Sequence, residues 1–393
     1  MKRIILFENG IETLSFFSKQ LAKAFEKENM ECFLFDLEEE EKSFFRLKKF
    51  IKEKETVLLT FNFNGLRGEQ VLYDSAGELY WKKWKIPCIN IMVDHPFYYH
   101  ESLEKVKKEL GFDLYFQINI DRDHENYMNR FFKEIENIFF LPLAGNVIEE
   151  GLEHEKEYSV VFTGNYTPPK EFRKYIERIN DEYTAFYDGI IKTLIENPNL
   201  SMEQAFEESL LQEMGSLSEK EVMKCMESMI FIDLYVRFYF RGMVIKTLVD
   251  AGIKVHVFGS GWEKLECIHR ENLIIKGQTD SCGCVKAMQK AKIALNVMPW
   301  FKNGSHDRVY TAMLNKALIV TDPSIYLKED MEDGKQGIFY ELSAIHELPQ
   351  KMKELLEDSK GRERIVEHAY IHSIELHTWE QRAKEIKKII VTI

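Results

Sequence analysis

The sequence predicts an α/β protein with two domains, each built around its own parallel β-sheet. Short apolar runs of strand length alternate with amphipathic stretches of helical period, and this alternation is typical of βαβ units. The chain has 393 residues, which is more than one hydrophobic core usually supports. Residues 147–156 are acidic and rich in turn formers, so we expect a linker there. We therefore place the first domain at residues 1–150 and the second at 157–377.

The composition argues against several classes of function. Hydrophobic residues make up 45% of the chain and aromatic residues 13%, so large cores are expected and disorder is not. The formal net charge of −12 argues against a nucleic-acid partner, because surfaces that bind phosphate backbones are normally basic. No apolar run has the length of a membrane span, so we expect at most peripheral contact with a membrane.

The cysteines indicate reduced thiols in a cytoplasmic protein. Six of them are scattered through a chain that opens with MKRIILFENG and shows no signal peptide. Cys282 and Cys284 follow Cys267 and His269, but their spacing is not that of a zinc finger. We therefore expect no bound metal and no cofactor.

The first domain is expected to contain six strands. They cover residues 2–7, 32–37, 57–63, 86–93, 114–120 and 138–141. Ligands of parallel α/β sheets gather outside the carboxyl ends of the strands. The polar residues that follow three of these strands, at 9–10, 62–65 and 94–95, should therefore share one edge of the sheet.

Asp94-His95-Pro96 is the segment of this edge whose side chains are best suited to catalysis. An imidazole titrates near neutral pH, so His95 is a candidate base that takes a proton from an acceptor hydroxyl. Asp94 would fix its tautomer. The alternative is a structural histidine that caps a loop braced by Pro96.

A rival signal is the carboxylate pair of Asp121 and Asp123, directly after a predicted strand. Paired carboxylates can bridge a divalent metal to a nucleotide diphosphate. The residues that follow read as an ordinary helix, however, and matches of three residues are common by chance.

The second domain is expected to begin with a strand at residues 158–162, followed by Gly164 and Asn165. Residues 168–232 predict a helical insertion, because they are too many for a connection inside a compact unit. A long helix at 233–251 should then lead to a strand at 255–258. Aromatic residues lie on several faces of this helix, so we expect it to be largely buried in the core.

Gly259-Ser260-Gly261 directly follow that strand. Two glycines separated by one residue allow the backbone to approach a ligand closely. The full dinucleotide fingerprint is absent, so this pattern alone is a weak signal.

The central stretch of the second domain is predicted to bind phosphate. It reads as a strand at 293–297, a polar turn at 303–307, a helix that begins at Arg308 and a strand at 317–321. A helix N-terminus offers unsatisfied N–H groups to an anion, and an arginine there adds a planar fork for two oxygens. Residues 325–333 are expected to be a polar connection.

This stretch also carries a resemblance to a known family. Its features are Asn303, RVYTAM at 308–313, ALIVTD at 317–322, Gly334, and Phe339-Tyr340. Together they resemble the donor-binding half of the glycosyltransferases related to spore maturation protein CgeB. Those enzymes have the GT-B fold, in which two Rossmann-like domains face a cleft. The resemblance implies a nucleotide sugar on the C-terminal domain and an acceptor approached by the N-terminal one.

We expect the donor to be bound by residues that come from several loops of the second domain. They are Gly164, Asn165, Gly259, Ser260, Gly261, Thr279, Gly304, Ser305, His306, Asp307, Arg308, Tyr310 and Thr311. The resemblance places Thr279 near the nucleotide base. It also implies a ribose-binding glutamate where this chain has Thr311, whose hydroxyl is a weaker partner for a ribose.

The predicted function is therefore metal-independent transfer of a sugar from a nucleoside diphosphate sugar, with UDP among the candidates. The resemblance implies a protein acceptor such as flagellin, or a surface glycan. Two alternatives stay open: a nucleotide-sugar epimerase, and a non-catalytic protein that binds a nucleotide sugar or a partner. We also expect residues 378–393 to form a helix that packs back on the N-terminal domain.

Overall fold

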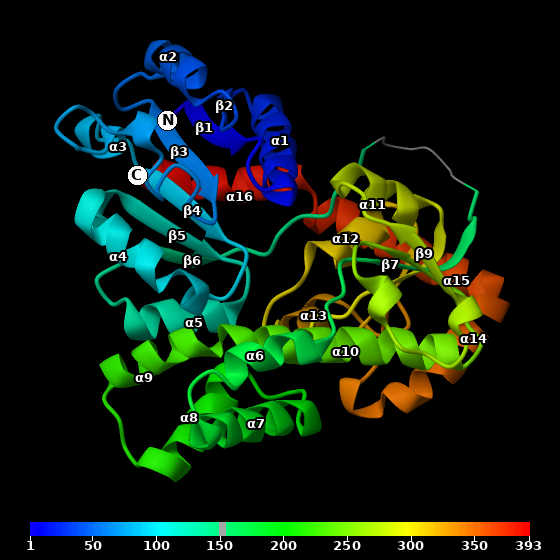
Figure 1. The fold of residues 1–393 in the computed structure, drawn as a ribbon. Coiled ribbons are helices and arrows are strands. Elements are labelled where there is room, and N and C mark those ends of the chain that lie inside the picture. Colours follow the sequence, from blue (N-terminus) through cyan, green and yellow to red (C-terminus); the bar gives the residue numbers. More distant parts are fainter. Residues whose placement is uncertain (149–154) are drawn as a thin grey trace. The chain divides into compact units, whose positions relative to one another are not determined.

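The computed structural model describes residues 1–148 and 155–393 (Figure 1). The chain forms two compact units. The first contains Met1–Ala144 and His377–Ile393, and the second contains Gly145–Leu376. Most of the linker expected at 147–156 lies outside the described residues.

The first unit contains one parallel sheet with the strand order β2-β1-β3-β4-β5-β6. Its strands are β1 Arg3–Glu8, β2 Glu31–Asp36, β3 Thr56–Phe61, β4 Cys88–Met92, β5 Tyr115–Asn119 and β6 Ile138–Phe140. All six predicted strands are confirmed. Every residue of β3, β4 and β5 is buried, as expected for a sheet with helices on both faces. The strand order reverses direction between β1 and β3.

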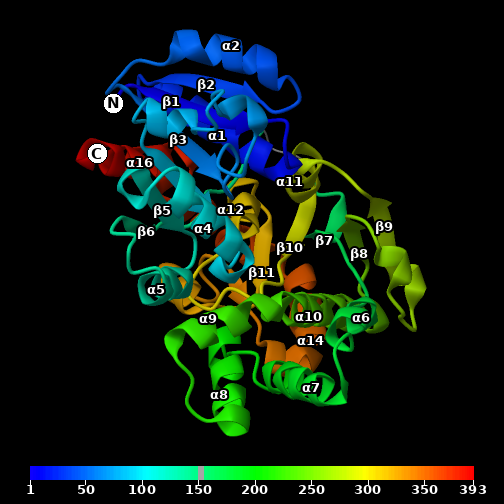
Figure 2. The ribbon, with the colours of Figure 1, turned by 60° about the vertical axis from the view of Figure 1, so that its left-hand side comes forward.

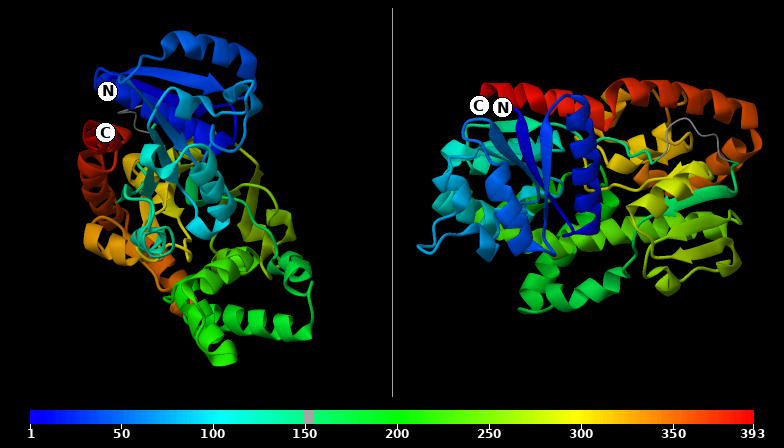
Figure 3. Two further views of the ribbon diagram at one scale, coloured as in Figure 1. Left: turned by 90° about the vertical axis from the view of Figure 1, so that its left-hand side faces the viewer. Right: turned by 90° about the horizontal axis from the view of Figure 1, so that it is seen from above.

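Helices cover this sheet. They are α1 Glu12–Lys27, α2 Glu40–Phe50, α3 Tyr80–Lys83, α4 His100–Glu109, α5 Arg122–Phe131 and α16 Trp379–Thr392. The C-terminal helix α16, red in Figure 3, packs on α1 of the same unit. The rings of Trp379 and Phe17 lie 5.4 Å apart between their centroids.

The second unit contains another parallel sheet, with the order β9-β8-β7-β10-β11-β12 (Figure 2). Its strands are β7 Tyr158–Thr163, β8 Val255–Phe258, β9 Leu273–Gly277, β10 Ala291–Leu295, β11 Leu318–Thr321 and β12 Ile338–Phe339. The chain moves from β7 outward to β8 and β9, then returns to the other side of β7 for β10. The topological switch point, where α/β sheets bind ligands, therefore lies between the carboxyl ends of β7 and β10.

The predicted helical insertion is confirmed. It consists of α6 Arg173–Ile176, α7 Asp181–Glu196, α8 Met202–Met214 and α9 Glu219–Met226. Ser201 and Ser218 begin α8 and α9 with capping boxes, in which the serine and a residue three positions later satisfy each other's backbone N–H groups. The predicted long helix is α10, Ile230–Asp250.

The remaining helices of the second unit flank its sheet. They are α11 Ser281–Gln289, α12 Asp307–Leu314, α13 Ile325–Asp330, α14 Leu348–Glu357 and α15 Ser359–Leu376. The prediction of a polar connection at 325–333 was wrong for α13. The hydroxyl of Ser324 accepts a hydrogen bond from the N–H of Leu327 and so begins this short helix. No helix of the described residues is long and apolar enough to cross a membrane.

Candidate functional site

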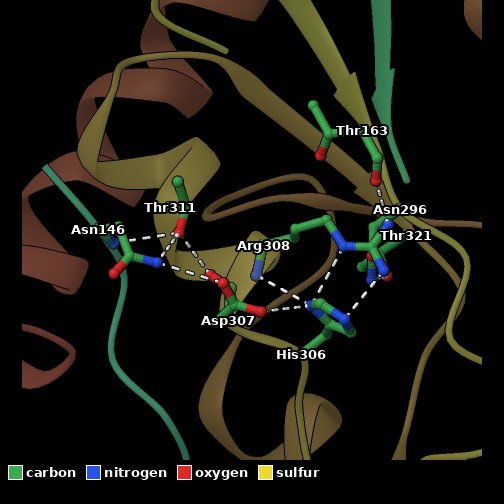
Figure 4. A network of polar contacts seen from close by, with 8 residues as sticks. All are labelled: Asn146, Thr163, Asn296, His306, Asp307, Arg308, Thr311 and Thr321. Carbon is green, nitrogen blue, oxygen red and sulfur yellow. Dashed lines mark hydrogen bonds and ion pairs between the residues drawn. The ribbon is translucent and has the colours of Figure 1, made fainter. Parts of the chain in front are cut away.

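Arg308 lies at the switch point of the second sheet. Its backbone belongs to the first turn of α12, and its Nη1 donates a hydrogen bond to the carbonyl oxygen of Thr163 across 2.6 Å (Figure 4). Thr163 is the last residue of β7. Gly164 follows it, and a Cβ at Gly164 would lie 3.3 Å from Nη1 of Arg308, so a larger residue would crowd the guanidinium. The helix N-terminus and the end of β7 therefore meet at one arginine.

His306 precedes α12 and contacts both of its first two residues. Its Nδ1 lies 2.7 Å from Oδ1 of Asp307, and its Nε2 lies 2.9 Å from Nη2 of Arg308. Nδ1 also accepts hydrogen bonds from the backbone N–H and the Nε–H of Arg308, each across 3.2 Å, so His306 caps the start of α12. Burial, together with the nearby charge of Arg308, lowers the pKa of His306 to about 4. His306 therefore connects Asp307 to Arg308 without adding a charge at neutral pH.

A second arginine approaches the same strand end from α10. Nη1 of Arg241 donates to the carbonyl oxygen of Asn165 across 2.6 Å. Its guanidinium lies 5.6 Å from the ring centroid of Phe162, and that of Arg308 lies 5.5 Å from the same ring. Burial lowers the pKa of Arg241 well below its ordinary value, and the positive charges of Arg308 and Arg237 lower it further. This edge of the sheet is therefore strongly cationic.

Sequence reasoning missed Arg241. We had assigned the long helix to the core because aromatic residues lie on several of its faces. The signal was present in the spacing, since Arg237 and Arg241 lie one turn apart on a helix that is otherwise largely apolar. A charged residue on a buried helix needs an oppositely charged or polar partner. Two arginines on such a helix therefore indicate that a partner lies close to them.

The glycines after β8 pack against the turn that follows β7. A Cβ on Gly259 would lie 2.4 Å from the carbonyl oxygen of Gly164, and one on Gly261 would lie 2.0 Å from that of Tyr166. Ser260 donates its N–H to Oδ1 of Asn165 across 2.9 Å. The close approach that these glycines allow therefore joins the turn after β8 to the turn after β7. Ser260 and Asn165 remain exposed at this edge.

Thr311 and Tyr310 form contacts within the unit. The Thr311 hydroxyl donates to the carbonyl oxygen of Asp307 across 2.8 Å and accepts from the N–H and Nδ2 of Asn146. Tyr310 is fully buried, and its hydroxyl lies 3.4 Å from Oδ2 of Asp330. A ribose would have to displace Asn146 to reach the Thr311 hydroxyl.

The turn before α12 carries a buried hydroxyl. Ser305 is fully buried, and its Oγ has no hydrogen-bond partner among the described residues. The hydroxyl of Thr163 and Oδ1 of Asn296 are also buried without a partner. The backbone of Gly304 is held by Ser324, whose hydroxyl donates a hydrogen bond to the Gly304 carbonyl oxygen across 2.6 Å. Unpaired polar atoms gathered near the ends of β7 and β10 are what a polar ligand can satisfy.

Thr279 lies farther along the edge, after the outer strand β9. It packs at the start of α11, where a Cβ on Gly283 would lie 1.8 Å from its Oγ1. The strand β8 separates β9 from β7, and α11 crosses back from β9 to contact α12 and β7.

The first unit has a cavity of about 580 Å³ at its own switch point. Ile11, Asn62 and Asp94, which follow β1, β3 and β4, lie on its wall together with Arg67, Tyr98, Tyr99 and Lys105. Asp94 accepts hydrogen bonds from Nδ2 of Asn62 across 3.1 Å and from the hydroxyl of Tyr99 across 3.0 Å. Asn62 and Phe63 both have positive φ, at 45° and 65°. A bulky residue in this conformation is strained, and such strain is often found at functional sites.

His95 does not line this cavity. Its Nδ1 accepts a hydrogen bond from the N–H of Phe97 across 3.2 Å. Its ring lies 4.5 Å from that of His124 and 5.0 Å from that of Tyr127, measured between centroids. The structure therefore separates the two side chains, with Asp94 toward the cavity and His95 packed against α5.

The carboxylate pair of Asp121 and Asp123 lies at the N-terminus of α5. Asp121 is buried, precedes α5 and accepts a hydrogen bond from the N–H of Asp123 across 2.7 Å. This geometry is that of an N-cap.

Comparisons with known proteins identify the fold. Residues 241–388 match the family model described as glycosyl transferase-like. HepE of Anabaena, solved with UDP and glucose, aligns over 100% of both chains with a TM-score of 0.54 and 10% identity. BGT of phage T4, solved with UDP-glucose, aligns over 100% of both chains with a TM-score of 0.55 and 11% identity. The chain has the GT-B fold.

The GT-B architecture predicted from the sequence is thus confirmed, and the match to the family model supports a glycosyltransferase. TarM of S. aureus is also similar, with 14% identity over 88% of this chain and a TM-score of 0.48. This chain spans 57% of the length of TarM. No sequence among the curated proteins matches it.

Proposed function

We propose that this GT-B chain is a glycosyltransferase that takes a sugar from a nucleoside diphosphate sugar and transfers it to a hydroxyl group of an acceptor. The observation that carries the proposal is the position of Arg308, whose guanidinium contacts the end of β7 beside the switch point. Sheets of this kind bind nucleotides at that place, and a helix N-terminus with an arginine suits phosphate groups. The residues that match the glycosyl transferase-like model include Arg308 and Arg241.

UDP is the nucleotide that we propose first. HepE was solved with UDP, and BGT with UDP-glucose. In the proposed reaction, negative charge develops on the departing diphosphate as the sugar bond breaks. The guanidinium of Arg308 and the first turn of α12 would stabilise this charge, so we propose that no metal is needed. The neutral ring of His306 holds Arg308 in place for this step.

Asp94 is the base that we propose for the acceptor hydroxyl. Its carboxylate lies on the wall of the cavity in the first unit, where Asn62 and Tyr99 fix its orientation. A positioned carboxylate can take the proton of an attacking hydroxyl. His95, which the sequence-based hypothesis made the base with Asp94 fixing its tautomer, packs against His124 and Tyr127. The proposed acceptor is a protein such as flagellin, or a surface glycan, as the resemblance to CgeB-related enzymes implies, and the proposed compartment is the cytoplasm.

A second candidate function is a protein that binds a nucleotide sugar without transferring it. It is favoured by Thr311, which stands where the resembling enzymes have glutamate and whose hydroxyl is engaged by Asn146 and Asp307. Incubation with UDP-glucose and UDP-N-acetylglucosamine in EDTA, followed by chromatography, separates the candidates. UDP release supports a transferase. Binding without turnover supports a binding protein, and conversion of one UDP-sugar into another supports an epimerase.

A further inference from the structure

We propose that Arg241 is a second arginine contact for the donor, and that Arg241 and Arg308 together make the site select nucleoside diphosphates over nucleoside monophosphates. This inference rests on the proposed function. It assigns a binding role to a residue of α10, a helix that the sequence placed in the core.

The two arginines bind the carbonyl groups of the residues that precede and follow Gly164 in the chain. Arg308 donates to the carbonyl oxygen of Thr163, and Arg241 donates to that of Asn165, each across 2.6 Å. Both guanidiniums also lie within 6 Å of the Phe162 ring, at 5.5 Å and 5.6 Å. Two separate helices thus bring a permanent positive charge to one short segment at the switch point. An anion bound at this segment would meet both charges.

Arg241 lacks the partner that a buried cation normally has. Only 7% of the residue is exposed, and no carboxylate forms an ion pair with it in residues 1–148 and 155–393. Among the described residues, its buried Nε has no hydrogen-bond acceptor. The positive charges of Arg308 and Arg237 act on Arg241 and repel it. A buried cation in this state destabilises the free protein, whereas a phosphate would neutralise it and satisfy its donors.

Arg237, one turn earlier on α10, provides the contrast. Its Nη2 forms an ion pair with Oδ2 of Asp233 across 2.9 Å. Both guanidiniums lie over the ring of Trp300, at 4.1 Å for Arg237 and 5.5 Å for Arg241, so the ion pair is what distinguishes the two arginines. The charge of Arg237 is therefore already compensated within the protein.

Two guanidiniums match two phosphate groups. Each planar fork can take two oxygens, so an anion with two linked phosphates can engage both arginines at once. A monophosphate can engage fully with only one of them. Preference for the diphosphate should therefore depend on Arg241 as well as on Arg308.

The test compares Arg241→Met with Arg237→Met in the full-length protein. Methionine keeps the length and apolar character of the buried stem and removes the charge. Calorimetry measures the affinities for UDP and UMP, and thermal unfolding measures the stability without nucleotide. We expect Arg241→Met to weaken UDP binding by roughly 10- to 100-fold, the loss of a charged hydrogen bond, and UMP binding by much less. Without nucleotide it should unfold at the same temperature as the wild type or higher, because repulsion is removed.

Arg237→Met should show the opposite pattern, with a lower unfolding temperature and UDP affinity within about threefold of the wild type, because it removes the ion pair with Asp233. The inference is overturned if Arg241→Met binds UDP as tightly as the wild type, or if it loses stability and weakens UDP and UMP equally, as a purely structural arginine would. If the wild type and Arg241→Met both bind UDP while Arg308→Met does not, only this inference fails. If the wild type binds no nucleotide, the proposed function fails with it.

Discussion

The hydroxyl of Thr311 accepts a hydrogen bond from the backbone N–H of Asn146 across 3.1 Å. The same hydroxyl donates to the carbonyl oxygen of Asp307 across 2.8 Å, inside the first turn of α12. Gly145 completes the contact, because a Cβ there would lie 2.5 Å from the carbonyl carbon of Tyr310. Thr311 therefore fastens residues 145–146 to the helix that carries Arg308.

Replacement of Thr311 by valine should lower the stability of the protein and leave donor binding largely intact. Valine keeps the shape but removes the hydroxyl that accepts from the buried backbone N–H of Asn146, which costs about 1–3 kcal/mol. Urea unfolding measures the stability, and calorimetry with UDP measures the affinity. Thr311→Ser, which keeps the hydroxyl, is the control. A loss of UDP affinity at unchanged stability would instead assign Thr311 to the ribose.

Asp94 and His95 should differ strongly in their effect on turnover. We expect Asp94→Asn to lower kcat by roughly 10²- to 10⁴-fold, as for loss of a general base, without weakening UDP binding. We expect His95→Gln to cost less than about tenfold, because its ring packs against His124 and Tyr127 away from the cavity wall. UDP release with acceptor present is the readout. A large loss in His95→Gln together with full activity in Asp94→Asn would reverse the assignment.

His306 should make the protein less stable as the pH falls. Its pKa is about 4 in the folded protein, against an ordinary value of 6.5, so the unfolded chain binds its proton first. The contribution is complete above pH 6.5 and is lost as the pH falls toward 4, by up to about 3 kcal/mol. His306→Asn can still cap α12 but does not titrate. Relative to the wild type, this variant should gain stability from pH 7 to pH 4. An unfolding difference that stays constant over that range would contradict the assignment of a neutral histidine.

Asp322 should act in the opposite direction. Burial raises the pKa of this carboxyl group to about 7, from an ordinary 3.8. The folded protein therefore binds the proton first, so the contribution of Asp322 to stability increases as the pH falls from 7 to 3.8, by up to about 4 kcal/mol. Asp322→Asn keeps an oxygen that can accept from the N–H of Met298 and removes the charge. It should stabilise the protein at pH 8 and have little effect at pH 4. Equal effects at both pH values would show that the carboxyl group is not held neutral.

The sequence predicted the strands well because each is an apolar run bounded by turn residues. Gly164 and Gly259 mark the ends of β7 and β8, and Arg308 stands next to its helix start, so the strand–turn–helix pattern also located the centre of the candidate site. Such signals are local. They depend only on residues that are neighbours along the chain, so they can be recognised without knowledge of tertiary contacts.

The features that the sequence did not reveal depend on contacts between distant segments. Arg241 reaches Asn165, which lies 76 positions away, only because α10 packs near the end of β7. From the sequence alone, Thr311 is interpreted only as a replacement for a glutamate. The structure shows that its hydroxyl accepts a hydrogen bond from Asn146, which lies 165 positions away in the chain. His95 and Asp94 are adjacent in sequence, but consecutive side chains can point to different surroundings, and these two do. Pairing of this kind is set by tertiary packing, which no local pattern encodes.

The most direct test of the account is a thermal shift with UDP in EDTA, for the wild type and Arg308→Ala. A ligand that binds only the folded protein at 100 times its Kd adds about 2.7 kcal/mol, which corresponds to a shift of roughly 5–10 °C for a unit of this size. Arg364→Ala, which removes an exposed arginine of α15, is the control. We predict the full shift in the wild type and the control, and none in Arg308→Ala. A shift that Arg308→Ala retains, or a shift that the wild type shows with Mg²⁺ but not in EDTA, would contradict the proposed site.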